Sequence, residues 1–114
     1  MLSEDRIHQK ILIWFRNNYC LKKHNPRHII FHVPNQGKDR KEQLRKSFLG
    51  TLAGVSDLII LANGKTYFVE VKDEKGRQSP KQIEFENRVK EQGFIYVVVR
   101  SLHEFKKFVN EYID

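Results

Sequence analysis

The sequence lacks the features that mark secreted and membrane proteins. Its single cysteine, Cys20, excludes a disulfide within the chain, which suits a reducing intracellular setting. No apolar run approaches the roughly 18 residues that a membrane-spanning helix requires, and the first residues do not form a signal-peptide pattern. We therefore expect a soluble intracellular protein, in a cytoplasm or in the interior of a host cell, with no membrane partner.

Acidic residues are also scarce relative to basic ones. The 114 residues include 21 lysines and arginines but only 14 acids, giving a net charge of +7. This excess favours a polyanionic partner, first of all a nucleic acid. The alternative is a basic adaptor protein whose charges are merely solvated. The length predicts one domain over residues 1–114, large enough for a real hydrophobic core.

Hydrophobic periodicity predicts an α/β protein with four helices and four strands. Ile7, Ile11, Trp14 and Phe15 follow a helical period, whereas the continuous apolar run 94–99 is typical of a strand buried on both faces. The last strand–helix–strand step implies parallel pairing, so we expect a mixed sheet. The expected elements are helix 4–18, strand 28–33, short helix 38–46, strands 58–61 and 66–72, helix 80–92, strand 94–99 and a helix from about 102.

Strands 58–61 and 66–72 form a predicted hairpin. The Asn63-Gly64 pair between them is a strong signal for a two-residue turn. If Ala62 then pairs with Lys65, the register places Asp57 directly opposite Glu70. Opposed residues on one sheet face have Cβ atoms roughly 4.5–5.5 Å apart, and like charges there repel. A cation between the two carboxylates would remove this repulsion.

The residues around this pair indicate a metal-dependent hydrolytic site. Lys72 shares the sheet face of Glu70, because residues two apart in a strand point the same way. Oxygen ligands such as Asp57 and Glu70 suit Mg²⁺ or Mn²⁺, and Lys72 could orient an attacking water or stabilise a developing charge. The alternative is a surface strand with an ordinary charge pair, since a Glu-x-Lys pattern often arises by chance.

Two further polar residues lie on predicted buried helix faces. Gln82 shares a face with Phe85 and Val89, so it points toward the sheet, where a buried amide needs partners. Glu4 precedes Ile7 by three residues and falls on the buried face of the first helix. Each has a plain alternative: Gln82 as cover for the core edge, and Glu4 as a first-turn acid favoured by the helix dipole.

Together, these motifs resemble the signature of the VRR-NUC domains, which belong to the PD-(D/E)XK nuclease superfamily. The resemblance rests on Gly54-Val55-Ser56-Asp57-Leu58, Glu70-Val71-Lys72 and Ser79-Pro80-x-Gln82, and it extends over nearly the whole chain. It implies an αβββαβ core, metal-dependent phosphodiester hydrolysis and, in small stand-alone members, often a homodimer. Proline commonly precedes the aspartate in this family; Ser56 replaces it here, and we expect little loss because that proline performs no chemistry.

Carried over position by position, the resemblance assigns roles to the site residues. Asp57 and Glu70 would be metal ligands, with the backbone carbonyl of Val71 as a third. Lys72 would be the catalytic lysine, and Gln82 the glutamine of the following helix. Glu4 matches an acid on the first helix of such domains and would complete the metal shell directly or through water.

The expected function is a Mg²⁺- or Mn²⁺-dependent DNA endonuclease. One alternative is a Holliday-junction-type resolvase that cuts branched DNA as a symmetric dimer. Another is a non-catalytic DNA-binding module, although the intact acid pair and lysine speak against a decayed site. Candidate phosphate contacts, each with solvated charge as its alternative, are Lys38, Arg40, Lys41, Arg45, Lys46, Lys75 and Arg77.

Overall fold

The computed structural model describes residues 2–34 and 39–114. Where both ends lie in this part of the chain, the observed elements agree with the predicted ones to within two residues. None of the helices found there is long and apolar enough to cross a membrane. The elements are α1 (Glu4–Tyr19), β1 (Ile29–His32), α2 (Arg40–Phe48), β2 (Leu58–Ala62), β3 (Lys65–Val71), α3 (Pro80–Glu91), β4 (Ile95–Val99) and α4 (Leu102–Tyr112).

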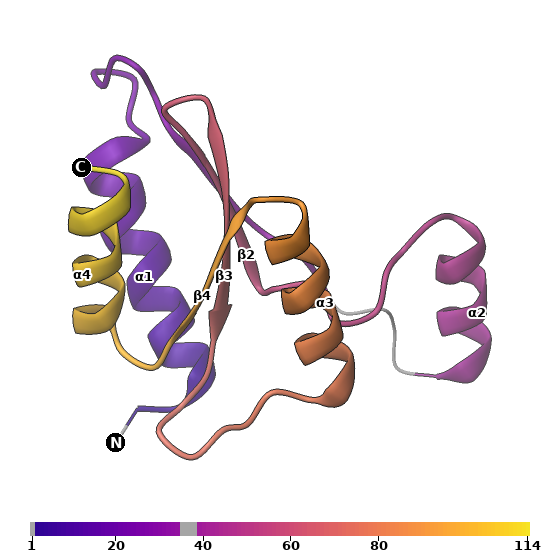
Figure 1. Ribbon diagram of the computed structural model, residues 1–114. Helices are drawn as coiled ribbons and strands as arrows, with labels where there is room; N and C mark the ends of the chain where they lie inside the picture. Colours follow the sequence, from indigo (N-terminus) through magenta and orange to yellow (C-terminus); the bar gives the residue numbers. More distant parts are fainter. Residues whose placement is uncertain (1, 35–38) are drawn as a thin grey trace.

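The four strands form one mixed sheet in the order β1-β2-β3-β4. The first three pair in antiparallel fashion, whereas β4 returns parallel to β3 after the α3 crossover, as predicted. Figure 1 shows α1 and α4 side by side on one face of the sheet and α3 on the other. The protein is therefore layered, with helices on both faces.

The main hydrophobic core lies between the sheet and the α1–α4 layer. Ile60 and Val69 on the sheet and Ile11, Phe15 and Phe105 on the helices are all fully buried. Burial of such side chains stabilises the fold by about 1.5–3 kcal/mol each. This core holds β2 and β3 rigidly, and these are the strands whose ends carry the candidate site.

Strand β4 is less buried than its sequence predicts. Tyr96 and Val99 are buried, but Ile95, Val97 and Val98 are only half-buried. The prediction of a strand buried on both faces was wrong because β4 lies at the edge of the sheet, with a strand neighbour on one side only. An apolar run indicates a strand, but it does not fix the position of that strand in the sheet.

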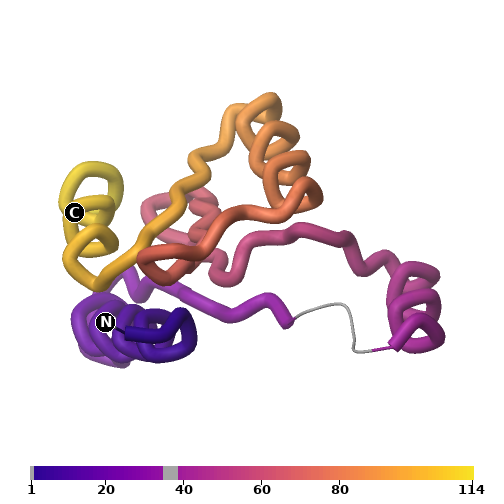
Figure 2. The backbone as a smooth tube through the Cα atoms, turned by 90° about the horizontal axis from the view of Figure 1, so that it is seen from below, coloured from indigo at the N-terminus to yellow at the C-terminus, as the bar shows by residue number. Residues whose placement is uncertain are grey.

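Helix α2 stands apart from the other elements, as both views show (Figures 1 and 2). Asp39 caps its start, since the Asp39 Oδ1 accepts a 2.7 Å hydrogen bond from the Glu42 amide. Yet none of the side chains of α2, from Arg40 to Phe48, is buried. Capping and intrahelical contacts thus support α2, but packing against the sheet does not.

Candidate functional site

The hairpin turn sets the register on which the site depends. Asn63 and Gly64 have φ angles of +55° and +74°, the left-handed values that a type I′ turn requires. Ala62 accordingly pairs with Lys65, as the sequence predicts. A slip of one residue would turn every side chain of β3 to the opposite face.

Asp57 and Glu70 meet at the end of this hairpin. The last regular pair of the ladder is Leu58 with Val69, so Asp57 and Glu70 come next on the two strands. The Val71 amide donates to Asp57 Oδ2 at 2.8 Å, and the Asp57 amide donates to Glu70 Oε1 at 3.1 Å. Each carboxylate is therefore held by a backbone N–H of the opposite strand, which fixes its position.

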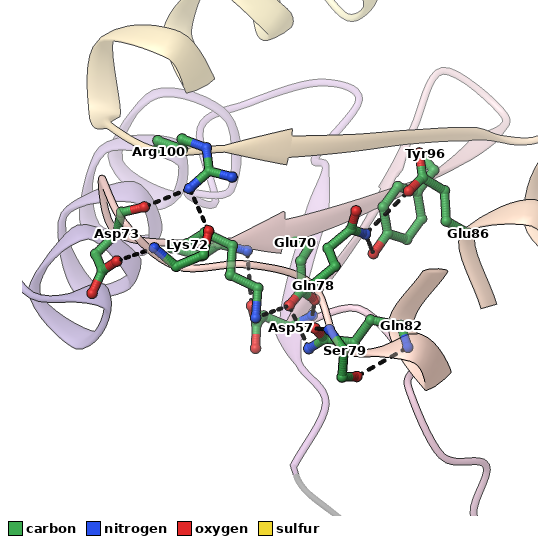
Figure 3. Close-up of polar contacts among 12 residues, drawn as sticks. Asp57, Glu70, Lys72, Asp73, Gln78, Ser79, Gln82, Glu86, Tyr96 and Arg100 are labelled. Carbon is green, nitrogen blue, oxygen red and sulfur yellow. Dashed lines mark hydrogen bonds and ion pairs between the residues drawn. The ribbon is translucent and has the colours of Figure 1, made fainter. Parts of the chain in front are cut away.

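Glu70 is the centre of a buried polar cluster (Figure 3). Its side chain is fully buried, and Lys72, also buried, places its Nζ 3.4 Å from Glu70 Oε2. The same oxygen accepts a 2.8 Å hydrogen bond from Gln82 Nε2. The structure thus brings together all four residues predicted as catalytic: Asp57, Glu70, Lys72 and Gln82.

The start of α3 orients Gln82. Its side-chain Oε1 accepts a 2.8 Å hydrogen bond from the Ser79 amide, while Ser79 Oγ accepts from the Gln82 amide. This capping box, with Pro80 following the cap, fixes the first turn of the helix. Gln82 therefore reaches Glu70 as a bridge between the helix cap and the buried carboxylate.

The loop before Asp57 packs tightly against that same first turn. Gly54 has φ +82°, and a Cβ at this position would collide with the backbone carbonyl of Lys81. Only glycine allows both this φ and this approach. Ser56 is buried and donates a 3.2 Å hydrogen bond from Oγ to the Leu58 carbonyl, so its hydroxyl is satisfied.

Burial and neighbouring charge shift the ionisation of Glu70. Burial raises the pKa of this carboxyl from 4.5 to about 7, and the charge of Asp57 adds to the rise, while Lys72 opposes it. With both acids ionised, the two acids and one lysine carry a net charge of −1. A proton or a metal cation would neutralise this charge.

Glu4 lies at the rim of the site on α1, half-buried rather than fully buried. Burial raises the pKa of Glu4; Lys72 lowers it, and Asp57 raises it again. These effects place Glu4 in the electric field of the site. Together with Asp57, it lines a hollow of about 440 Å³.

Two histidines that the sequence did not single out as site residues line the same hollow. The rings of His8 and His32 lie edge to face with centroids 5.0 Å apart, and His32 Nδ1 is 3.1 Å from the Asp57 carbonyl oxygen. Their positions in the sequence could have indicated that they lie near the site. His8 is one helical turn after Glu4, and His32 ends the strand that pairs with Leu58.

The donor set suits a hard, partly hydrated cation. Within the described residues, no group of three or more His, Cys, Asp or Glu side chains is arranged to hold a metal ion. The two opposed carboxylates are those of Glu70, which is buried, and Asp57, which is half-buried. Mg²⁺ typically takes only one or two carboxylates with several waters. Such a set fits Mg²⁺ or Mn²⁺ and is too small for a closed zinc or calcium cage.

The predicted cationic contacts fall into two separate groups. Lys75 and Arg77 lie exposed on the loop that follows β3 and leads to α3, close to the site in the chain. Arg40, Lys41 and Arg45 are exposed on α2, away from the hairpin (Figure 1). Lys46 is part of the second group and forms a 3.2 Å ion pair with Glu42, while Lys38 lies outside the described residues.

Arg100, which the sequence did not single out, anchors the loop after β3. Its NH1 group donates 2.7 Å hydrogen bonds to the Asp73 and Gly76 carbonyls (Figure 3). Asp73 in turn accepts from the amides of Lys75 and Gly76. The loop that carries Lys75 is thereby fixed relative to the end of β4.

Comparisons with known proteins agree with this fold. A solved structure described as a "VRR_NUC domain protein" superposes with a TM-score of 0.77 at 23% identity, covering 99% of this chain and 89% of that one. A second, described as "VRR_NUC domain", gives a TM-score of 0.64 at 20% identity, covering 97% and 99%. No curated protein matches the sequence. The family model for the VRR-NUC domain matches residues 2–102, and the chain therefore belongs to this nuclease family.

Proposed function

We propose that the protein is a Mg²⁺- or Mn²⁺-dependent endonuclease that hydrolyses phosphodiester bonds in DNA. The observation that carries this proposal is the convergence of Asp57, Glu70, Lys72 and Gln82 at one end of the hairpin. A buried carboxylate such as that of Glu70, with the second acid Asp57 beside it, is costly for the fold unless it serves chemistry or is neutralised. The net charge of +7 supports a polyanionic substrate.

Four groups would hold the metal ion. Asp57 and Glu70 supply the carboxylates, the Val71 carbonyl supplies a third oxygen, and Glu4 completes the shell directly or through water. When bound, the ion would lower the pKa of a water and neutralise charge on the scissile phosphate. Backbone amides already fix both carboxylates, so little reorganisation would be needed on binding.

Lys72 and Gln82 have distinct roles in this proposal. Lys72 Nζ, beside Glu70, would orient the attacking water and stabilise negative charge on the phosphate. Gln82 would act as a positioning residue, because its contact runs through Glu70 Oε2. Lys75 and Arg77, with the cations of α2, would contact DNA phosphates.

A homodimer is part of the proposal. The resemblance to small stand-alone VRR-NUC domains implies a homodimer, and the exposed helix α2 supports this expectation. A dimer would present two sites to one DNA molecule. This arrangement is also what the alternative function, resolution of four-way junctions, requires.

A cleavage assay tests the function. Supercoiled plasmid, linear duplex and a four-way junction are incubated with Mg²⁺, Mn²⁺ or EDTA, using wild-type protein, Asp57→Asn and the distant control Asp114→Asn. We expect metal-dependent cutting by the wild type and the control only. Preference for the junction would assign the protein as a resolvase. DNA binding without cutting under every condition would overturn the nuclease and leave a non-catalytic DNA-binding module.

A further inference from the structure

Helix α2 carries apolar side chains that are not buried in the single chain. Phe48 is 89% exposed, and Leu44, one helical turn earlier, and the adjoining Leu49 are also largely exposed. Leu44 and Phe48 are four residues apart and lie on the same side of the helix. We call these three residues the α2 apolar face.

A second apolar surface lies on the sheet. The pairing of Phe68 with Ile59, and of Ile59 with Phe31, places these residues on one face. Phe68 contacts Phe85 of α3, so this is the face that α3 covers. Beyond α3 the face continues over β1 and β2, and none of the helices in residues 2–34 and 39–114 covers it there (Figure 1). We call this part the open sheet face; it consists of Ile29, Phe31, Ile59 and Leu61.

The open sheet face lacks half of the layer that covers the opposite face. On the core side, two helices, α1 and α4, pack over the strands, whereas on the other side α3 stands alone (Figure 1). Ile29 and Phe31 consequently remain 51% and 41% exposed. Helix-on-sheet packing is the usual way to bury such a face. One more amphipathic helix would complete the layer.

We propose that α2 of one copy packs its apolar face on the open sheet face of a second copy, and that the exchange is reciprocal. The inference deepens the homodimer in the proposed function by naming the surface that forms it. The chain carries both the uncovered face and an unpartnered helix, so a second copy supplies the missing element to each. A two-fold axis repeats every contact and closes the assembly.

Chemistry favours this occupant over an unrelated partner. Both surfaces are aliphatic and aromatic at their centres, while the remainder of α2 is polar and basic through Arg40, Lys41 and Arg45. Charged residues are depleted from interface cores and concentrate at rims. Reciprocal docking would leave these cations at the rim and bring them onto the partner, where they would extend its DNA-contacting surface.

Association in solution provides the first test. Light scattering in about 0.3 M salt, where charge repulsion between the +7 chains is screened, is expected to give a dimer. Phe48→Asp is expected to weaken dimerisation at least about 100-fold, whereas Ile13→Asp on α1, 58% exposed in the same chain, should leave it unchanged. Circular dichroism checks that both variants remain folded. A wild-type monomer at about 100 µM, or equal effects of the two variants, would overturn the proposal.

Disulfide trapping provides the second test and separates exchange from self-docking. In a Cys20→Ser background, Phe48→Cys protein is mixed with Phe31→Cys protein under oxidation. We expect a cross-linked dimer from the mixture in excess of that from either variant alone. A chain carrying both cysteines that cross-links within itself at high dilution would show α2 docking on its own sheet and would overturn the dimer surface. Neither test uses metal or DNA, so failure of the nuclease proposal leaves its outcome unaffected.

Discussion

Two regions of the molecule differ in how far a single chain provides contacts for their side chains. One is the hairpin end that carries Asp57 and Glu70, and the other is helix α2. At the hairpin end, the backbone amides of the opposed strands bond both acids, and Lys72 and Gln82 contact Glu70. In α2, by contrast, apolar side chains face solvent and none is buried. The polar groups of the hairpin end are satisfied within one chain, whereas the apolar side chains of α2 would be buried only in the dimer that we propose.

This contrast also separates the proposed chemistry from the proposed assembly. The site needs atoms held within a fraction of an ångström, and a rigid core with a fixed register supplies that precision. Helix α2 needs only a matching apolar surface. Changes at the hairpin end should therefore alter metal binding and catalysis, and changes in α2 should alter association and DNA affinity.

The largest effect at the hairpin end is expected from removal of a proposed metal ligand. Asp57→Asn keeps a group that can accept the Val71 amide but loses the charge, so the fold should survive. We expect Mn²⁺ affinity, measured by calorimetry, to fall by more than the roughly 10–100-fold that removal of a ligand's supporting partner costs. The control Asp114→Asn should bind normally. Unchanged affinity in Asp57→Asn would place the metal elsewhere.

The next largest effect is expected from disruption of the close contact between Gly54 and α3. Gly54→Ala introduces both an unfavourable φ and a collision with Lys81, so we expect a loss of at least about 2 kcal/mol of unfolding free energy, with reduced cleavage as Gln82 moves. Gly64→Ala serves as the control. It has a similar φ of +74° but open space, and should cost only about 1 kcal/mol. Equal losses in urea unfolding would show that the contact with α3 is unimportant.

The ionisation of Glu70 predicts a dependence of stability on pH. Because the pKa of Glu70 is raised to about 7 in the folded protein, its protonated form favours the fold. That contribution is present below about pH 4.5 and is lost as the pH rises through 7. In EDTA, Glu70→Gln should therefore melt a few degrees above wild type at pH 8 and near it at pH 4.5.

The matched control for this experiment is Glu84→Gln, an exposed acid on α3. It should follow the wild-type profile at both pH values. Addition of Mn²⁺ should raise the melting temperature of the wild type at pH 8 but not that of Glu70→Gln. A lower melting temperature for Glu70→Gln at pH 8 would contradict the assigned cost of the buried charge.

The smallest effect is expected for single cations of α2. Arg45→Ala should weaken DNA binding modestly and lower the slope of log affinity against log salt by about one. Arg88→Ala, on the exposed side of α3, provides the comparison. Fluorescence anisotropy at several salt concentrations measures both slopes. If the two variants behave alike, α2 has no special part in DNA binding.

The local part of this structure could be predicted from sequence. Asn63-Gly64 fixes a turn, the turn fixes the register, and the register brings Asp57 to Glu70. Helical periodicity likewise directs Gln82 to the sheet, where it bonds Glu70. These predictions succeeded because they depend on neighbours within a few residues or on one pairing rule.

The remaining features depend on contacts between distant segments. The edge position of β4 follows from strand order, which an apolar run does not encode. His32 reaches the site through the pairing of β1 with β2, and Arg100 reaches the loop after β3 from the far end of β4. The isolation of α2 is also a property of the whole fold, because its sequence predicts a helix equally well in any setting.

The most direct test of the central claim is plasmid cleavage by three proteins in Mn²⁺ and in EDTA: wild type, Lys72→Ala and Lys65→Ala. Both lysines lie in or directly after β3, but Lys65 is exposed at the turn and Lys72 lies beside Glu70. We predict metal-dependent cutting by wild type and Lys65→Ala, and a loss of about 100-fold or more in Lys72→Ala with DNA binding retained. Equal cutting by all three proteins, or cutting that persists in EDTA, would contradict the account.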